Sequence, residues 1–217
     1  MLQSANLFSR LLLITLFVFL ANEYGYAQDD DDYNSETIFG INLNSNGGLI
    51  GGAIIRHSRI LTPTKNLNLG LEVVNVKHPN EIRISTIAGG IYVIGKKNYF
   101  IVFRPQVGLE KELFTKGKED GVRVSVLLNG GPSLGLLKPY YIQFEQFGII
   151  EVVPYDEQLH DPLTKGNNII GGAGFFQGFE GTKMVPGIHA KVGFNIEFGN
   201  VSSTLSGLET GFLLEGF

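Results

Sequence analysis

Cysteine and tryptophan are absent from the 217 residues of this chain, and methionine occurs only twice. Without cysteine, the chain has neither a disulfide framework nor an N-terminal cysteine that could carry a lipid. Lysine and arginine number 17 and aspartate and glutamate 21, and the net charge of -4 argues against nucleic acid as a partner. Beyond residue 27, no segment stays apolar over the roughly 20 residues that a transmembrane helix needs. Because 43% of the residues are nevertheless hydrophobic, we expect the apolar side chains to lie on strands.

The N-terminus has the features of a secretory signal peptide. Arg10 precedes an unbroken apolar run over residues 11–21, and Gly25 and Ala27 are small residues at the two positions that a signal peptidase reads. The run is short for a membrane-spanning helix. We therefore expect residues 1–27 to be a cleaved signal peptide that exports the chain, with an uncleaved anchor helix as the alternative.

Glycine (29 residues) and phenylalanine (16 residues) are abundant in the chain. Four consecutive aspartates predict an acidic, disordered lead-in over residues 28–36. From residue 37 to residue 217 we expect one domain, in which apolar residues alternate with polar or small ones and turn-forming residues such as Asn46-Gly47 separate the segments. This period of two is typical of β-strands. The alternating segments are 37–44, 48–61, 66–76, 98–114, 121–141, 186–199 and 203–217.

The segment 121–141 shows the alternation most clearly. Valine and leucine occupy one side, whereas the other side is polar or small, with Arg123, Ser125 and Asn129. A soluble barrel buries its apolar face around a ligand, whereas an outer-membrane barrel turns that face toward lipid and keeps polar groups inside. A membrane strand needs about nine to eleven residues, and soluble strands average about five or six. The long segments therefore favour a membrane barrel.

Connection lengths support the same interpretation. Two long stretches, 77–97 and 140–168, fall at one end of the predicted barrel, and the connections 62–66, 115–121 and 199–203 at the other end are short. Short periplasmic turns opposite longer surface loops are typical of outer-membrane proteins. We therefore expect an all-β fold, an antiparallel up-and-down transmembrane β-barrel, rather than a lipocalin-like soluble carrier.

The strand phase assigns side chains to two faces of this barrel. A charge withdrawn from water requires a partner, so we expect the lumen to be plugged by a self-neutralising charge network, with a conducting or catalytic interior as the alternative. The predicted lumenal residues are Glu72, Arg104, Glu110, Glu112, Arg123, His189, Lys191, Glu197 and Glu209. The predicted lipid-facing residues are Tyr99, Ile101, Phe103, Val122, Val124, Val126, Val192, Phe194 and Ile196.

Particular contacts are also expected inside the lumen. Arg123 should pair with Glu110 or Glu112 across the preceding hairpin. Gly131 and Gly135 should leave room for long charged side chains from neighbouring strands.

Two further features of the segment 121–141 concern its backbone and its end. Pro132 has no N–H group, so strand pairing should loosen there or form a bulge. Tyr140 and Tyr141 lie where the strand would leave the hydrocarbon, and we expect them in an aromatic girdle.

The strand count predicts an incomplete barrel. Counting from an exported N-terminus gives seven strands, and the seventh, 203–217, then ends at the cell surface. Bacterial single-chain barrels have an even number of strands, since an odd count leaves one parallel seam. We therefore expect a nominally eight-stranded barrel that lacks its last inward strand; the alternative is that the glycine-rich segment 167–179 crosses the membrane rather than forming a surface hairpin.

The segments 95–114, 121–141 and 186–199 resemble a family of small outer-membrane barrels of the Bacteroidota type. The resemblance implies a porin-like barrel in the cell outer membrane of a Gram-negative envelope, surrounded by outer-membrane lipids. It implies no specific activity.

We expect an integral outer-membrane barrel with a structural or interaction role, an envelope protein as a partner through its surface loops, and no cofactor. The second hypothesis is an outer-membrane lipid-modifying enzyme on the same scaffold, and the third a soluble periplasmic lipid-binding barrel. No catalytic or metal-binding residue is predicted, because the histidines are scattered and the rim cluster of His160 with Asp156, Glu157 and Asp161 contains no serine. The stretch 171–176 is rich in glycine but lacks the context of a phosphate-binding loop.

Overall fold

The computed structural model describes residues 34–44, 48–77, 81–114, 122–156, 168–198 and 206–217. The predicted signal peptide, the four aspartates and the short connections 115–121 and 199–203 lie outside these residues. In the described part of the chain, no helix is long and apolar enough to cross a membrane.

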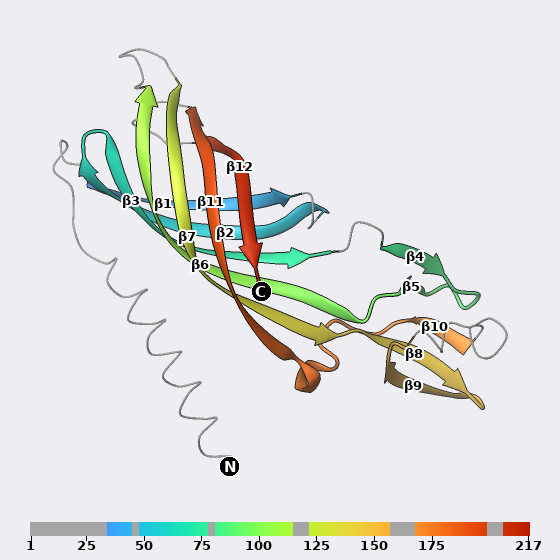
Figure 1. Cartoon of the computed structure of the whole chain (residues 1–217). Coiled ribbons are helices and arrows are strands. Elements are labelled where there is room, and N and C mark those ends of the chain that lie inside the picture. The colour runs from blue at the N-terminus through green and yellow to red at the C-terminus, as the bar shows by residue number, and fades with distance from the viewer. Residues whose placement is uncertain (1–33, 45–47, 78–80, 115–121, 157–167, 199–205) are drawn as a thin grey trace, which may run out of the picture. The chain divides into compact units, whose positions relative to one another are not determined.

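Seven long antiparallel strands form one curled sheet (Figure 1). Each long strand pairs with the next long strand along the chain, in the order β1-β2-β3-β6-β7-β11-β12. The all-β class and the seven strands predicted from the period of two are thus confirmed. The strands are β1 Ser35–Asn44, β2 Gly48–Thr62, β3 Lys65–Val76, β6 Asn98–Phe114, β7 Arg123–Pro139, β11 Lys183–Phe198 and β12 Ser206–Gly216.

Several strand boundaries differ from the sequence-based expectation, and β11 begins at Lys183, three residues before the predicted segment 186–199. β1 begins at Ser35, so the last two residues of the predicted lead-in belong to the sheet. β7 runs from Arg123 to Pro139 and is shorter at both ends than the segment 121–141. Alternation alone did not mark these ends, because the residues beyond them continue the same pattern.

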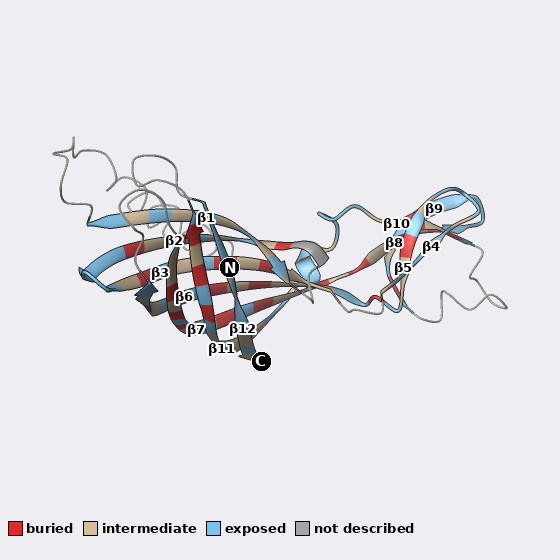
Figure 2. Ribbon diagram, turned by 90° about the horizontal axis from the view of Figure 1, so that it is seen from above, coloured by how far each residue is buried: buried red, intermediate tan, exposed pale blue. Residues whose placement is uncertain are grey.

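Burial alternates along the strands of the curled sheet (Figure 2). In β3, Asn68 and Glu72 are buried, whereas Leu69 and Leu71, which lie between them in the sequence, are exposed. Successive side chains of a strand point to opposite faces. The sheet therefore buries a largely polar face and exposes an apolar one, the reverse of the usual soluble arrangement.

The sheet has two edges, formed by β1 and β12. Among the described residues, no strand pairs with the outer side of either one. Direction reverses at each of the six antiparallel steps, so β1 and β12 run the same way. A direct β1–β12 pair would have to be parallel, and the described strands form a curled open sheet rather than a closed eight-stranded barrel.

The sequence suggested that the two long connections are plain surface loops. In the structure, both connections contain short strands. β4 (Ile82–Ser85) and β5 (Ile91–Ile94) pair as a hairpin, and β8 (Tyr141–Gln146) lies between β9 (Ile149–Pro154) and β10 (Ile169–Gly172). A 3-10 turn, η3, follows at Phe179–Gly181. We call the five short strands the small unit.

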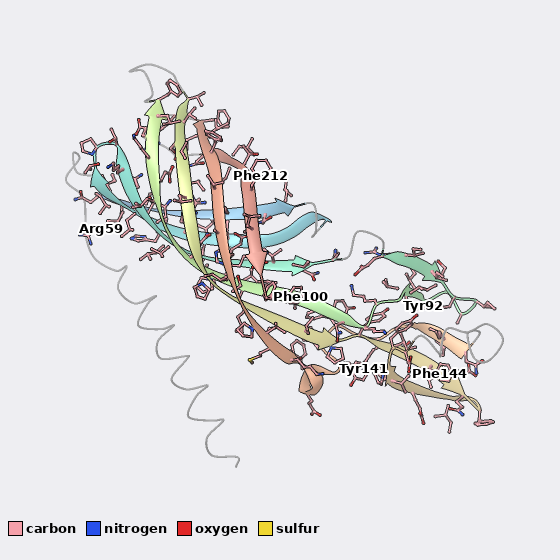
Figure 3. The ribbon with its side chains drawn as sticks, viewed as in Figure 1. Arg59, Tyr92, Phe100, Tyr141, Phe144 and Phe212 are labelled. Carbon is pink, nitrogen blue, oxygen red and sulfur yellow. The ribbon has the colours of Figure 1, made fainter. Side chains whose placement is uncertain are left out.

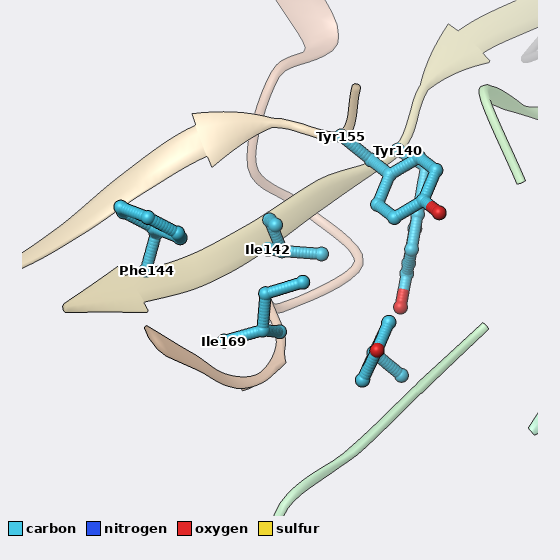
Figure 4. Packing of buried hydrophobic residues seen from close by; sticks show 6 residues of the cluster. Tyr140, Ile142, Phe144, Tyr155 and Ile169 are labelled. Atoms are coloured by element: carbon cyan, nitrogen blue, oxygen red, sulfur yellow. The ribbon is translucent and has the colours of Figure 1, made fainter. Parts of the chain in front are cut away.

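Aromatic and aliphatic side chains hold the small unit together (Figure 4). Tyr92 of β5 contributes to a core with Ile142 of β8 and Ile169 of β10. The Thr86 hydroxyl donates a hydrogen bond of 2.7 Å to the Ile170 carbonyl. This bond also joins the β4–β5 hairpin to the sheet of β8, β9 and β10. Because β10 pairs with β8, the segment 167–179 does not add a strand to the curled sheet.

Tyr140 belongs to this core, so its predicted place in an aromatic girdle is wrong. Its side chain is buried, and its hydroxyl oxygen accepts a hydrogen bond of 3.2 Å from the Val93 N–H. Burial raises the pKa of the Tyr140 hydroxyl above its usual range, outweighing the opposite effect of this hydrogen bond. Tyr141 is half-buried and begins β8. The chain thus turns into the small unit where the sequence suggested a membrane interface.

Pairing between β6 and β7 is interrupted where two prolines oppose each other. Phe103 pairs with Leu134 and Val107 with Gly130, and the ladder has no pairs between them. Both strands advance four residues across the gap, so no bulge forms. The unchanged register places Pro105 opposite Pro132, and neither residue has an N–H to donate. The expected loosening of pairing is therefore present, but without the bulge.

Close approaches in the sheet depend on glycine. A Cβ at Gly131 would lie 2.2 Å from the Pro105 carbonyl oxygen. A Cβ at Gly135 would lie 2.5 Å from the Phe100 ring and 3.0 Å from that of Phe217. The space at Gly135 thus holds two aromatic rings, which meet edge to face at 5.0 Å, rather than the long charged side chains that we expected.

We predict that Gly131→Ala destabilises the folded chain and that Gly216→Ala does not. The added methyl group at 131 would overlap backbone atoms of β6, at a cost of about 1 to 3 kcal/mol. Gly216 lies in the same sheet, and a Cβ there has open space. Denaturant midpoints of the two refolded variants measure the difference, and equal midpoints would contradict the close approach of β6 and β7.

Candidate functional site

The polar face of the curled sheet carries the nine predicted lumenal residues. Glu72, Glu110, Arg104, His189 and Glu197 are buried there. The remaining four, which are half-buried, are Glu112, Arg123, Lys191 and Glu209. The structure brings most of them into two groups of interacting charges.

The first group surrounds Glu72 of β3. One carboxylate oxygen of Glu72 lies 3.0 Å from Nη1 of Arg104, and the other lies 3.6 Å from Nζ of Lys191. Lys191 also pairs with Glu209 of β12, at 2.5 Å, and Arg56 of β2 pairs with the other oxygen of Glu209. One network thus joins strands from both halves of the sheet.

Glu215 near the end of β12 extends this network. Arg104 holds its carboxylate with two hydrogen bonds, from Nε at 2.8 Å and from Nη2 at 2.6 Å. The Ser133 hydroxyl donates to Glu215 at 2.6 Å and lies 3.0 Å from Nδ1 of His189. Two-pronged arginine–carboxylate contacts fix geometry as well as charge. We call Arg56, Glu72, Arg104, Lys191, Glu209 and Glu215 the Glu72 group.

The second group lies around Glu110 of β6. Its carboxylate accepts hydrogen bonds from Asn68 at 3.2 Å and from Asn195 at 3.1 Å, and a further one from the Ser125 hydroxyl. Asn195 also donates to Glu197, at 3.1 Å. Three amide and hydroxyl donors thus stabilise the buried Glu110 carboxylate.

Arg123 joins this second group, but not through the predicted partners. Its guanidinium lies 2.7 Å from Glu197 and 3.8 Å from Glu36, whereas we expected Glu110 or Glu112. Glu197 belongs to β11, which pairs with β7 directly opposite Arg123. The hairpin to β6 was the nearer neighbour in sequence, but β11 provides the facing residue. We call Glu36, Glu110, Arg123 and Glu197 the Glu110 group.

The two groups differ in charge. The Glu72 group has three cations and three carboxylates, and its formal charge is zero. The Glu110 group has three carboxylates and only Arg123 as a cation, which leaves a formal charge of -2. A cavity of about 110 Å³ adjoins the second group and is lined in part by Glu110, Glu112 and Arg123. The network is therefore balanced in one part and negative in the other.

Neutral polar side chains fill the polar face beside the charges. Ser58, Gln106 and Asn129 are buried, and their side-chain polar atoms have no hydrogen-bond partner among the described residues. Nε2 of His189 is also buried and likewise has no hydrogen-bond partner among the described residues. Buried polar atoms of this kind are usually hydrated. We therefore expect ordered water in the interior of the curled sheet.

Sequence reasoning missed several members of the network. Glu215 lies six residues after Glu209 on β12, so strand phase could have found it. Arg56 lies in β2, where isoleucines fall on both faces and hide the alternation. Glu36 was assigned to the lead-in, and no pattern in so short a segment marked it as part of a strand.

The predicted lipid-facing residues lie on the opposite, apolar face of the sheet, with one difference. Val122, Val192 and Phe194 are exposed. Tyr99 instead packs against Tyr140, with ring centroids 5.5 Å apart, because it lies at the end of β6 beside the small unit. The half-buried members of the set are Ile101, Phe103, Val124, Val126 and Ile196.

Further apolar residues extend this exposed face to both edges of the sheet. Figure 3 shows side chains projecting from it, with Phe212 labelled on β12. Phe39 on β1 and Phe212 on β12 are 76% and 81% exposed, although phenylalanine is normally buried. The exposed face also includes Ile41, Leu43, Leu69, Leu71, Val107, Leu109, Leu128, Ile188, Leu208 and Leu214.

A buried lysine lies where the curled sheet meets the small unit. Nζ of Lys138 lies 5.1 Å from the ring centroid of Tyr99 and 5.3 Å from those of Phe175 and Phe179. Cation–π attraction compensates in part for lost hydration. Lys138 thus fastens the chain around η3 to the ends of β6 and β7.

The contacts of Ser133, His189 and Glu215 do not form a catalytic triad. In a triad, the histidine lies between the serine and the carboxylate. Here Ser133 lies between the other two, with its hydroxyl 2.6 Å from the carboxylate of Glu215, and all three are on the polar face. Asp156 of the predicted rim cluster is exposed, and residues 157–167 lie outside the described residues. The described histidines and carboxylates form no group of three that could hold a metal ion.

We predict that Arg104→Leu destabilises the folded chain strongly and that Arg59→Leu has little effect. Removing Arg104 leaves the carboxylates of Glu72 and Glu215 without their main partner, at a cost of about 3 to 5 kcal/mol. Arg59 is exposed on β2 and provides the matched control. Chemical denaturation of the refolded variants in detergent gives both values. Equal midpoints would show that the interior is hydrated enough to stabilise unpaired carboxylates.

Comparisons with known proteins give no family for this chain: no family model, no curated protein and no solved structure matches it.

Proposed function

We propose that the chain is an integral outer-membrane β-barrel protein with a structural or interaction role and a polar interior plugged by its own charge network. The observation that carries this proposal is the reversed polarity of the curled sheet. Buried positions include Glu72, Arg104 and Glu110, whereas exposed positions include Phe39 and Phe212. Outer-membrane barrels have this arrangement, because lipid covers their outward side chains.

The extent of the apolar face supports the proposal. It runs across all seven strands, from Phe39 on β1 to Leu214 on β12. Soluble monomers rarely expose contiguous apolar patches larger than a few hundred Å². A hydrocarbon environment removes the cost of this exposure.

The interior argues against the alternative of a soluble lipid carrier. A carrier needs an apolar cavity, and small-molecule sites usually have volumes of about 300 to 1,000 Å³. The cavity beside Glu110 has about 110 Å³, and its lining includes Glu110, Glu112 and Arg123. An acyl chain in this space would separate paired charges.

Strand length is a third support. A membrane strand requires about nine to eleven residues, and each of the seven strands has between 10 and 17. The small unit lies in the connections from β3 to β6 and from β7 to β11, where a barrel carries its surface loops. Its β8–β9 hairpin exposes Phe147, Ile149 and Ile150, which are suited to contact with an envelope protein.

Membrane fractionation tests the proposal directly. The chain, expressed with its N-terminal segment in a Gram-negative host, should sediment with outer membranes and resist extraction by urea and carbonate. Release into the soluble fraction by either wash would contradict an integral location.

We predict that Val192→Lys impairs membrane assembly and that Val152→Lys does not. The two valines have similar exposure, 48% and 40%, but Val192 lies in the middle of β11, whereas Val152 belongs to the small unit. A lysine facing lipid near mid-strand costs about 2 to 4 kcal/mol. Folded yield in lipid vesicles measures the difference. If water surrounded both positions, the two substitutions would be equally mild.

A further inference from the structure

The free edge of β1 presents backbone groups that no described strand pairs with. β2 occupies one side of β1, and β11 is the one described strand that pairs with β12. An unpaired edge is a template for another strand, and an extended peptide can add to it through main-chain hydrogen bonds. An extended segment that supplies matching backbone groups can therefore pair with this edge.

The direction of the strands restricts this partner. Because β1 and β12 run the same way, a strand antiparallel to β1 is also antiparallel to β12. One added strand can then satisfy either edge in the geometry that the rest of the sheet uses. Direct closure of β1 on β12 cannot do so, since that seam would be parallel.

Charge pairs already hold both edges in position. Arg123 of β7 lies 3.8 Å from Glu36 of β1, and Arg56 of β2 pairs with Glu209 of β12. These contacts cross the interior and do not involve the free edges. An incoming strand therefore meets a preorganised edge and loses less affinity to ordering.

The side chains of β1 determine the pattern that the partner needs. Phe39 and Ile41 project from the apolar face, whereas Glu36 and Gly40 belong to the polar one. Cross-strand neighbours on the same face of a sheet interact. The partner should alternate apolar side chains on the outer face with small or polar ones on the inner face.

Charge determines one inner position. One carboxylate oxygen of Glu36 is buried and has no hydrogen-bond partner among the described residues. Its nearest cation, Arg123, is shared with Glu197, and the Glu110 group as a whole has a formal charge of -2. Since Glu36 is the second residue of β1, a cation near the C-terminal end of an antiparallel partner would face it.

We propose that the free edge of β1 binds, in trans, an extended polypeptide segment of about ten residues, the length of β1. The segment runs antiparallel to β1, alternates apolar and small polar residues, and carries an inward lysine or arginine near its C-terminal end, opposite Glu36. This interaction surface is separate from the lipid-facing surface of the proposed function, and it does not require membrane insertion.

Synthetic peptides test the proposal with the purified full chain in detergent. A labelled eleven-residue peptide that alternates valine and threonine, with lysine as its tenth residue, should bind at least ten-fold more tightly than the same peptide with glutamate there. Hydrogen exchange should slow at alternate amides of β1 when the lysine peptide binds. N-methylation of the peptide amides that face β1 should abolish binding.

Variants of the chain locate the charge. Glu36→Lys should reverse the preference between the two peptides, and Glu36→Gln should remove it without introducing a new charge. Glu151→Lys, an equal charge change at an exposed residue of β9, should leave the preference unchanged. Equal affinity of the wild-type chain for both peptides, or unchanged binding after N-methylation, would overturn the proposal. Protection of β1 in a self-associated chain without peptide would also overturn it, because a second copy would then occupy the edge.

Discussion

A charged side chain removed from water is stable only beside a partner, and in this chain the partners come from strands far apart in the sequence. Glu72 on β3 needs Arg104 on β6 and Lys191 on β11, while Glu209 on β12 needs Arg56 on β2. A flat sheet cannot bring these strands together. The pairing of buried charges and the curl of the sheet therefore depend on each other. Loss of one charge pair should change the positions of both edge strands, β1 and β12.

Close packing of the same face explains why glycine is so frequent. Strands that curl around long side chains approach one another closely, and a Cβ at Gly131 would overlap the backbone of β6. Gly135 instead makes room for the rings of Phe100 and Phe217. The two rings pack edge to face beside Gly135, and Lys138 with its aromatic neighbours fastens the chain around η3 to the ends of β6 and β7.

The sequence was sufficient for the seven long strands and for the faces of most of their residues, because the period of two is a property of each strand alone. Glu72 and Leu71 could be assigned to opposite faces without knowledge of any neighbour. Pairing was harder to predict, since it depends on which strand lies alongside. Arg123 was expected to meet the preceding hairpin, but β11 brings Glu197 opposite it. Tyr140 was misassigned because local alternation does not show that β8 leaves the sheet and joins a separate core.

The distribution of charge links the interior to the open edge. A balanced group can be buried without further partners, and the Glu72 group, with three cations and three carboxylates, meets this condition. The Glu110 group does not meet this condition, because its carboxylates outnumber its one cation. Glu36, on the edge strand β1, is more exposed than Glu197 of the same group. Among the described strands, the outer edge of β1 and the excess negative charge of the Glu110 group therefore lie at the same place. A single added strand with one inward cation would satisfy both, whereas lipid could cover the apolar face of β1 but neither hydrogen-bond its edge nor neutralise Glu36.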